Sequence, residues 1–304
     1  MNHLSNIRQI IINHLWQTYL DKVLAAQQIC ALFNEKLILD HFAIIDLPGP
    51  HSGIPLLKQI FTSIGFIEAG SGYLPDKQND FIWLREENCE NKIAQEVLPQ
   101  IVIADFRLHE LPQSVRNVIA KYIQPISPLP LLEIKELVAA VENGDISAQP
   151  ILMNTILNQF NCQKWPMPTL RDYQTIKEAN ELMAWVLVFG RQPNHFGLLI
   201  HHLSQFNNLK AFDDYLKVKL NMQFNSRENE IKGSPELGIE QSSTADHLIQ
   251  VKLEDGVLEI PSPFVEFVWR FPKDAKNKAF YWKDYYTDFY APNANRVIES
   301  IFSN

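Results

Sequence analysis

The sequence predicts an α+β protein in which one unit, strand–helix–strand–strand–strand (βαβββ), occurs twice. A strand-like run at residues 37–45 precedes a helical pattern and three more strand-like runs. The same order returns after residue 190, beyond a long stretch with helical periodicity. Each copy opens with a strand that carries a histidine, His41 in the first and His195 in the second. We therefore expect two similar modules that form one partly closed sheet around a shared site.

The composition argues against two classes of partner. With 304 residues, of which 46% are hydrophobic and 20% charged, the chain can bury the core of an ordinary globular protein. The formal net charge of -8, without a stripe of basic residues, argues against a nucleic-acid partner, because binding phosphates requires clustered Lys and Arg. No apolar run approaches the roughly 20 residues that cross a bilayer, so we expect no membrane partner.

The cysteines and the first residues indicate a reducing, cytoplasmic location. Cys30, Cys89 and Cys162 are odd in number and far apart, and no CxxC pair is present. This pattern predicts neither a disulfide framework nor a thiolate zinc site. The first residues also lack the basic segment of a secretory signal.

We expect a single domain over residues 1–304, with a helical block added to the two modules. Apolar residues at helical spacing in the first segment predict two helices joined near Lys22. The segments are N-terminal helices at 1–35, a first module at 36–108, a helical insert at 109–190, and a second module with a C-terminal cover at 191–304.

The first module begins with a strand over residues 37–45, which Pro48 and the residues after it end. Residues 53–64 have a helical pattern, and Gly65 is placed to end that helix. The strands expected after it are residues 66–73, 80–84 and 100–108.

In the insert, Thr169 and Asp172 are spaced as the N-cap pair of a helix that we expect to run to about Val188. A helix is expected at residues 209–218 of the second module. The strands expected there are residues 194–203, 237–243, 247–253 and 264–271.

Three of the β-prone runs each carry one side chain that can bind a metal: His41, His195 and Glu266. Alternation along a strand puts Glu266 on one face with Phe264, where an unpaired carboxylate would cost several kcal/mol. Arg270 lies roughly 13 Å away along the same strand by the usual rise per residue, so a metal is the better partner for Glu266.

Two imidazoles and one carboxylate with open positions suit Fe(II) oxygen chemistry, and they also suit some Zn, Mn or Ni sites. The ligand set alone does not choose among these metals. His201 and His202 follow closely in the sequence, and we interpret them as neighbours of the site or as surface residues.

Six short stretches carry a resemblance that extends over nearly the whole chain. They are DHFA at 40–43, PTLRDY at 168–173, NH at 194–195, QSSTAD at 241–246, FVEF at 264–267 and NANRVI at 293–298. In this order they resemble the DUF1338 family, the 2-oxoadipate dioxygenase/decarboxylase group related to the vicinal oxygen chelate (glyoxalase-like) fold.

The resemblance implies an Fe(II) enzyme whose ligands are the same His41, His195 and Glu266. A 2-oxo acid would chelate the iron through its carboxylate and keto oxygens, and O2 would take a remaining position. The implied reaction converts 2-oxoadipate and O2 into 2-hydroxyglutarate and CO2.

One position departs from the family pattern. An Arg that would clamp a substrate carboxylate often stands four residues after the first His, and this chain has Ile45 there. Either another cation serves, with Arg191 and Arg107 as candidates, or the substrate lacks the distal carboxylate. Asn293 matches a substrate-side turn of the family, and we expect Gln241 to act as a hydrogen-bond donor near the site.

Two other functions remain open from the sequence. One is a glyoxalase-like isomerase, lyase or hydrolase that uses Zn or Ni on the same fold. The other is a non-catalytic relative that binds a small molecule, for which Ile45 is the main argument.

Overall fold

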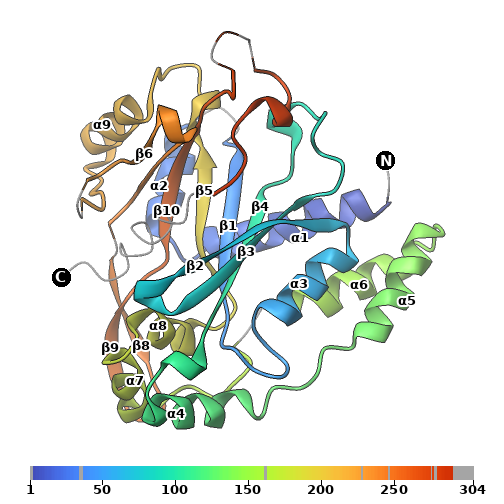
Figure 1. The fold of residues 1–304 in the computed structure, drawn as a ribbon, viewed down its shortest axis with the longest axis vertical. Helices are drawn as coiled ribbons and strands as arrows, with labels where there is room; N and C mark the ends of the chain where they lie inside the picture. The colour runs from blue at the N-terminus through green and yellow to red at the C-terminus, as the bar shows by residue number, and fades with distance from the viewer. Residues whose placement is uncertain are drawn as a thin grey trace.

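The computed structural model describes residues 3–33, 37–160, 163–226, 229–245, 247–274, 276 and 279–289. A curled mixed sheet of eight strands, in the order β2-β3-β4-β1-β5-β10-β7-β6, forms its centre (Figure 1). The strands are β1 (Leu39–Ile45), β2 (Phe66–Leu74), β3 (Asn79–Glu86), β4 (Gln100–Phe106), β5 (Pro193–Leu199), β6 (Lys232–Ser234), β7 (Ile239–Ser243) and β10 (Phe264–Arg270).

The sheet consists of two halves with the same topology. In the first half β1 is parallel to β4, and in the second half β5 is parallel to β10. The other pairings within each half are antiparallel, and an antiparallel β1–β5 pair joins the halves at the centre. A helix follows the first strand of each half, α3 (Ile54–Ser63) or α9 (Leu209–Leu220). The predicted α+β fold with duplicated βαβββ modules is thus confirmed.

Alternation along β1 separates two environments. Phe42 and Ile44 point into the core under α1 (His3–Leu20), α3 and neighbouring helices. His41, Ala43 and Ile45 point to the opposite face, which lines a cavity. We call the face that carries His41 the inner face. Because every second side chain of β1 reaches it, the central strands can hold a polar site without interrupting the core.

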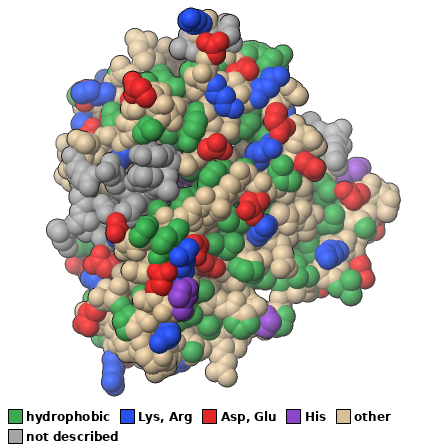
Figure 2. Space-filling model, viewed as in Figure 1, with side chains coloured by type: hydrophobic (Ala, Val, Ile, Leu, Met, Phe, Trp, Pro, Cys, Tyr) green, Lys and Arg blue, Asp and Glu red, His purple; other side chains and the backbone are tan. Residues whose placement is uncertain are grey.

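The N-terminal prediction of two helices is confirmed, because α1 ends at Leu20 and α2 (Leu24–Leu32) follows it. No helix in the described ranges is long and apolar enough to cross a membrane. On the face shown in Figure 2, Lys and Arg side chains are interspersed with Asp and Glu.

The insert contains α4 (Gln113–Ile123), α5 (Leu131–Glu142), α6 (Ala148–Leu157), α7 (Leu170–Lys177) and α8 (Glu181–Phe189). Thr169 caps α7 as expected, because its side chain accepts from the Asp172 backbone N–H. The prediction of one helix running to Val188 is wrong. Asn180 caps a new helix there, since its side chain accepts from the Met183 N–H, and α8 begins at this point.

The strand assignment of the second module needs two corrections. The run at 247–253 is not part of the main sheet, because β8 (Leu248–Lys252) pairs with β9 (Val257–Pro261) in a separate hairpin. The edge strand of the main sheet is instead β6, whose three residues lack an apolar pattern. The first strand of this module also ends at Leu199, and a 3₁₀ turn follows at residues 200–202.

Candidate metal centre

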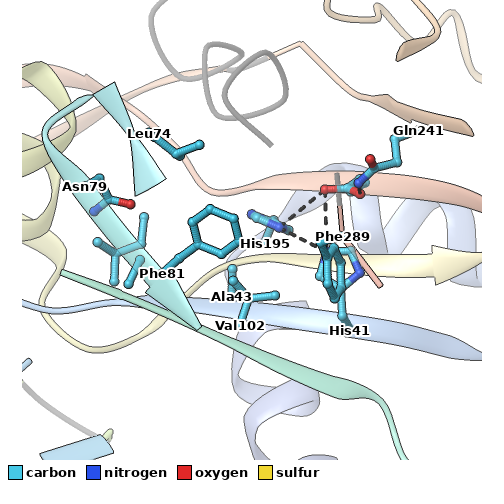
Figure 3. A pocket seen from close by; sticks show the side chains of 12 residues that line it. His41, Ala43, Leu74, Asn79, Phe81, Val102, His195, Gln241 and Phe289 are labelled. Atoms are coloured by element: carbon cyan, nitrogen blue, oxygen red, sulfur yellow. Dashed lines mark hydrogen bonds and ion pairs between the residues drawn. The ribbon is translucent and has the colours of Figure 1, made fainter. Parts of the chain in front are cut away.

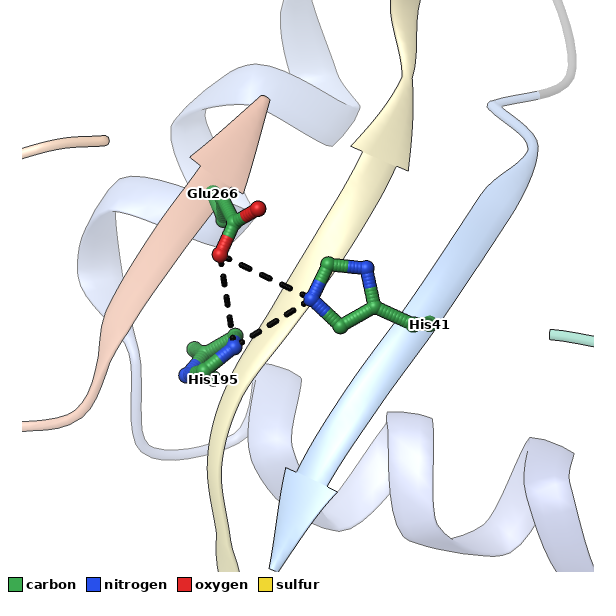
Figure 4. Close-up of side chains that lie close together, drawn as sticks. All are labelled: His41, His195 and Glu266. Carbon is green, nitrogen blue, oxygen red and sulfur yellow. Dashed lines mark hydrogen bonds and ion pairs between the residues drawn. The ribbon is translucent and has the colours of Figure 1, made fainter. Parts of the chain in front are cut away.

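The register of the three central strands brings His41, His195 and Glu266 together. On β1 and β5, His41 lies opposite Gly197, and His195 lies opposite Ala43. On the other side of β5, Glu266 also pairs with Gly197. This register places the three side chains around Gly197 on the inner face. Figure 4 shows them pointing toward one another from three neighbouring strands.

The three ligating atoms are close enough to share one ion. The Nε2 atoms of His41 and His195 are 3.3 Å apart, and Glu266 Oε2 lies 3.6 Å from the first and 3.4 Å from the second. All three residues are buried. Ligands that bind a small ion at about 2.0–2.2 Å stand about 3.0–3.5 Å from one another, so these separations match a shared ion.

Gly197 makes room for the first imidazole. A Cβ atom at this position would lie 2.5 Å from His41 Cε1 and 2.6 Å from Nδ1. The His41 ring thus packs directly against the backbone of Gly197, and any side chain at position 197 would displace the ring. Gly197 was not singled out in the sequence, although a lone glycine inside a strand pattern signals a close approach of this kind.

The residue before each histidine fixes the orientation of its ring. His41 Nδ1 lies 2.8 Å from Asp40 Oδ2, and His195 Nδ1 lies 2.9 Å from Asn194 Oδ1. Because both oxygens accept, each Nδ1 carries the hydrogen, and Nε2 keeps the lone pair that a metal requires. This leaves each histidine able to bind an ion through Nε2 alone.

Arg270 and Gln241 hold two other side chains of the site, Asp40 and Glu266, in place. The Arg270 guanidinium pairs with Asp40, with Nε 2.5 Å from Oδ1 and Nη2 2.9 Å from Oδ2. It is therefore not the partner of Glu266. Gln241 Nε2 donates to Glu266 Oε1 at 2.6 Å, which leaves Oε2 facing the histidines.

The pKa values of the two histidines shift in opposite directions. Burial acts to lower the pKa of His41, but the charge of Glu266 and the hydrogen bond to Asp40 outweigh it and raise that pKa to about 9. Burial dominates at His195 and lowers its pKa to about 4. The pKa of Glu266 is lowered, because the nearby histidines outweigh its burial. At neutral pH and without a metal, His41 thus carries a second proton, on Nε2, while His195 is neutral.

A cavity of about 40 Å³, room for roughly two or three water molecules, adjoins the cluster. Figure 3 shows His41, His195 and Gln241 at one end of it and Asn79 at the other. Phe289 closes the metal end, with its ring centroid 4.9 Å from that of His41. The rest of the lining consists of Ala43, Ile45, Leu74, Phe81, Val102, Ala104 and Glu266.

Comparison with known proteins agrees with the fold. The model of a family described as 2-oxoadipate dioxygenase/decarboxylase matches residues 27–285. The chain belongs to this family. It is 25% identical over 243 residues to the chloroplastic 2-oxoadipate dioxygenase/decarboxylase of Arabidopsis thaliana. That match covers 78% of this chain and 60% of the plant protein, so the chain spans less than two thirds of the plant protein's length.

Two solved structures share the fold of this dioxygenase/decarboxylase family member. The hydroxyglutarate synthase of Oryza sativa, crystallised with 2-oxoadipate, superposes with a TM-score of 0.78 at 23% identity and covers 98% of this chain and 93% of its own. A glyoxalase superfamily protein from Ralstonia eutropha gives a TM-score of 0.71 at 17% identity, covering 88% of this chain and 84% of its own.

In this family member, Ile45 lines the cavity on the face that carries His41, as the strand alternation predicts, and Gln241 lines it as well. Arg191 and Arg107 do not line it. Arg191 is buried against Asp46, 2.8 Å from Nε to Oδ2, and also donates to the His51 carbonyl.

Arg107 lies half-exposed and pairs through two nitrogens with Asp80, each at 2.7 Å. Asn293 lies outside the described residues. A substrate contact by Gln241, Arg191, Arg107 or Asn293 stays a prediction.

His201 and His202 lie apart from the cluster in the turn after β5. Their rings are 4.0 Å apart and contact Tyr285. Besides Gly197, the sequence reasoning gave no role to Asp40 and Asn194. Both could have been found, because each directly precedes one of the two candidate histidines.

Proposed function

We propose that this protein is an Fe(II)-dependent dioxygenase/decarboxylase of a 2-oxo acid, with His41, His195 and Glu266 as the metal ligands. The observation that carries the proposal is the convergence of these three buried ligand atoms within 4.8 Å of one another beside a cavity. The 2-oxoadipate dioxygenase/decarboxylase family supplies the reaction class. Its balanced form is 2-oxoadipate plus O2 giving 2-hydroxyglutarate plus CO2.

The donor set fits iron in a site that is open on one side. Two neutral imidazole nitrogens and one carboxylate oxygen are ligands typical of non-haem Fe(II) oxygenases. A bound Fe(II) would supply the redox chemistry with O2 and would polarise the 2-oxo acid. Zn, Mn or Ni would fit the same ligands, and metal analysis of protein purified without chelators separates the glyoxalase-like alternative from the iron enzyme.

The chain's own residues hold the ligands and exclude water. Asp40 and Asn194 fix the tautomers of the two histidines, and Gln241 turns Glu266 so that one oxygen faces them. The apolar walls between the two ends of the cavity keep bulk water from the reacting centre.

The test is anaerobic loading with Fe(II), followed by O2 uptake and CO2 release with 2-oxoadipate and a panel of other 2-oxo acids. We expect Glu266→Gln to lower bound iron and turnover by about 100-fold or more, because it removes a charged ligand. Glu240→Gln, on neighbouring β7 but outside the cluster, is the control and should match the wild type. Absence of turnover on every acid, with iron bound, would contradict the proposal.

A further inference from the structure

The cavity end away from the metal centre carries an unsatisfied acceptor. Asn79, at the start of β3, is fully buried and lines the cavity. Its Nδ2 donates to the Asp105 carbonyl at 2.8 Å, which fixes the orientation of the amide. Its Oδ1 is buried and has no hydrogen-bond partner among the described residues. In Figure 3 this oxygen lies on the side of the amide nearer Phe81.

A buried acceptor of this kind favours a hydrogen-bond donor in the cavity. Leaving it without a donor becomes costly once a bound molecule has displaced water from the cavity. Leu74, which pairs with Asn79 across β2 and β3, and Phe81, two residues further along β3, line the cavity beside it and offer no donor. A donor on the bound molecule, such as an amide N–H or a hydroxyl, would satisfy it.

The same end of the cavity is unfavourable for a carboxylate. Among the described residues, no Lys or Arg lines the cavity. Arg107 is already paired with Asp80, and Arg191 with Asp46. A second carboxylate placed here would lose its water, meet no opposite charge among the described lining residues and face the lone pairs of Asn79 Oδ1.

We propose that the substrate is a 2-oxo acid whose side chain is uncharged and ends in a hydrogen-bond donor, which Asn79 Oδ1 accepts. The inference rests on the proposed function, since it places the 2-oxo acid group at the metal end. Asn79 is then the residue that determines specificity at the far end of the cavity, and Ile45, Val102 and Ala104 contact the methylene groups between the two ends.

The test compares two molecules of nearly the same shape, 2-oxoadipate and its distal monoamide, with 2-oxohexanoate as the apolar reference. We expect kcat/KM from O2 uptake to be at least about tenfold higher for the monoamide than for the diacid. Calorimetric binding to the anaerobic Fe(II)-loaded protein should show the same order. Equal or better use of 2-oxoadipate would overturn this inference and leave the proposed function intact.

Asn79→Leu tests the residue itself. We expect the advantage of the monoamide over 2-oxohexanoate to fall to within about twofold, because the acceptor is gone while the branched shape of the side chain is kept. Asn117→Leu, on the exposed face of α4, is the matched control and should keep the advantage. An unchanged preference in a folded Asn79→Leu protein would overturn the role of Asn79.

The two proposals fail in different ways. If no 2-oxo acid supports O2 uptake, the proposed function fails, and calorimetry on the same three molecules still decides the preference at Asn79. If the wild type turns over 2-oxo acids but binds the diacid as tightly as the monoamide, only the inference about the side chain fails.

Discussion

The two candidate histidines differ in the residue that orients them. Asp40 is a carboxylate, and it holds the His41 ring together with the buried Arg270. Asn194 is neutral, and it gives His195 the same orientation without a charge. This difference contributes to the opposite pKa shifts of the rings, raised to about 9 at His41 and lowered to about 4 at His195. A metal that binds at neutral pH must therefore displace one proton, from His41.

The residue whose size matters most to the centre is Gly197. We expect Gly197→Ala to weaken metal binding by about 10- to 100-fold, as loss of a supporting residue does in other metal sites. The reason is that the added Cβ would lie 2.5 Å from His41 Cε1, so the imidazole must leave its position. Competition titration against a chromogenic chelator measures the affinity, and circular dichroism checks that the fold is kept.

Gly256→Ala is the control for this prediction. Its added Cβ would meet the end of the Leu170 side chain at 2.6 Å, in the β8–β9 hairpin. We expect metal affinity to be unchanged there. Equal affinities in wild type and both variants would show that His41 is not a ligand.

At the level of elements, the sequence predicted the strands that carry the site. β1, β5 and β10 are buried, largely apolar runs that each carry one of the three candidate ligands, and alternation assigns that ligand to one face. The packing around Gly197 and the unsatisfied oxygen of Asn79 could not be predicted in this way. Both depend on which residues of distant strands lie opposite one another, and a single sequence does not contain that register.

A hydrogen bond between Asp213 of α9 and Ser242 of β7 links this helix to the sheet. Asp213 is fully buried and accepts from Ser242 Oγ at 2.9 Å. Burial, opposed by this hydrogen bond, raises the pKa of Asp213 to about 8. The unfolded chain loses the proton at about pH 4, so between about pH 4 and 8 the folded state binds more protons. Stability should therefore fall as the pH rises through this range.

We expect Asp213→Asn to remove this pH dependence and to exceed the wild type in stability by about 2 kcal/mol at pH 8. Urea unfolding at pH 5 and pH 8 measures the free energy of unfolding of each protein. Asp214→Asn is the control, because its side chain is half-exposed and paired with Lys210, so the change should stay below about 0.5 kcal/mol. If the free energy of unfolding changed with pH equally in the wild type and in Asp213→Asn, Asp213 would be ionised in the folded protein.

For the whole molecule, the two halves have the same topology but contribute unequally to the centre. On β4, Gln100 pairs with His41, and on β10, Phe264 pairs with His195. Two residues further along, the equivalent positions are Val102 and Glu266. The second half therefore supplies two ligands and the first half one, and Val102 lines the cavity instead. This asymmetry leaves one side of an ion open to a substrate, as catalytic metal sites require.

An ion coordinated by residues of β1, β5 and β10 would connect the two halves of the sheet. We therefore expect it to raise the free energy of unfolding of the whole protein. At a free metal concentration 100 times the dissociation constant, the gain is about 2.7 kcal/mol, which is about 5 °C in Tm for a chain of this size. Differential scanning calorimetry with Fe(II) under anaerobic conditions, and with Zn(II) in air, measures the shift. Glu266→Gln should lose it and Glu240→Gln should keep it. A shift of the same size in both variants would place the ion outside the His41, His195 and Glu266 centre, because binding at an unrelated surface site does not depend on Glu266.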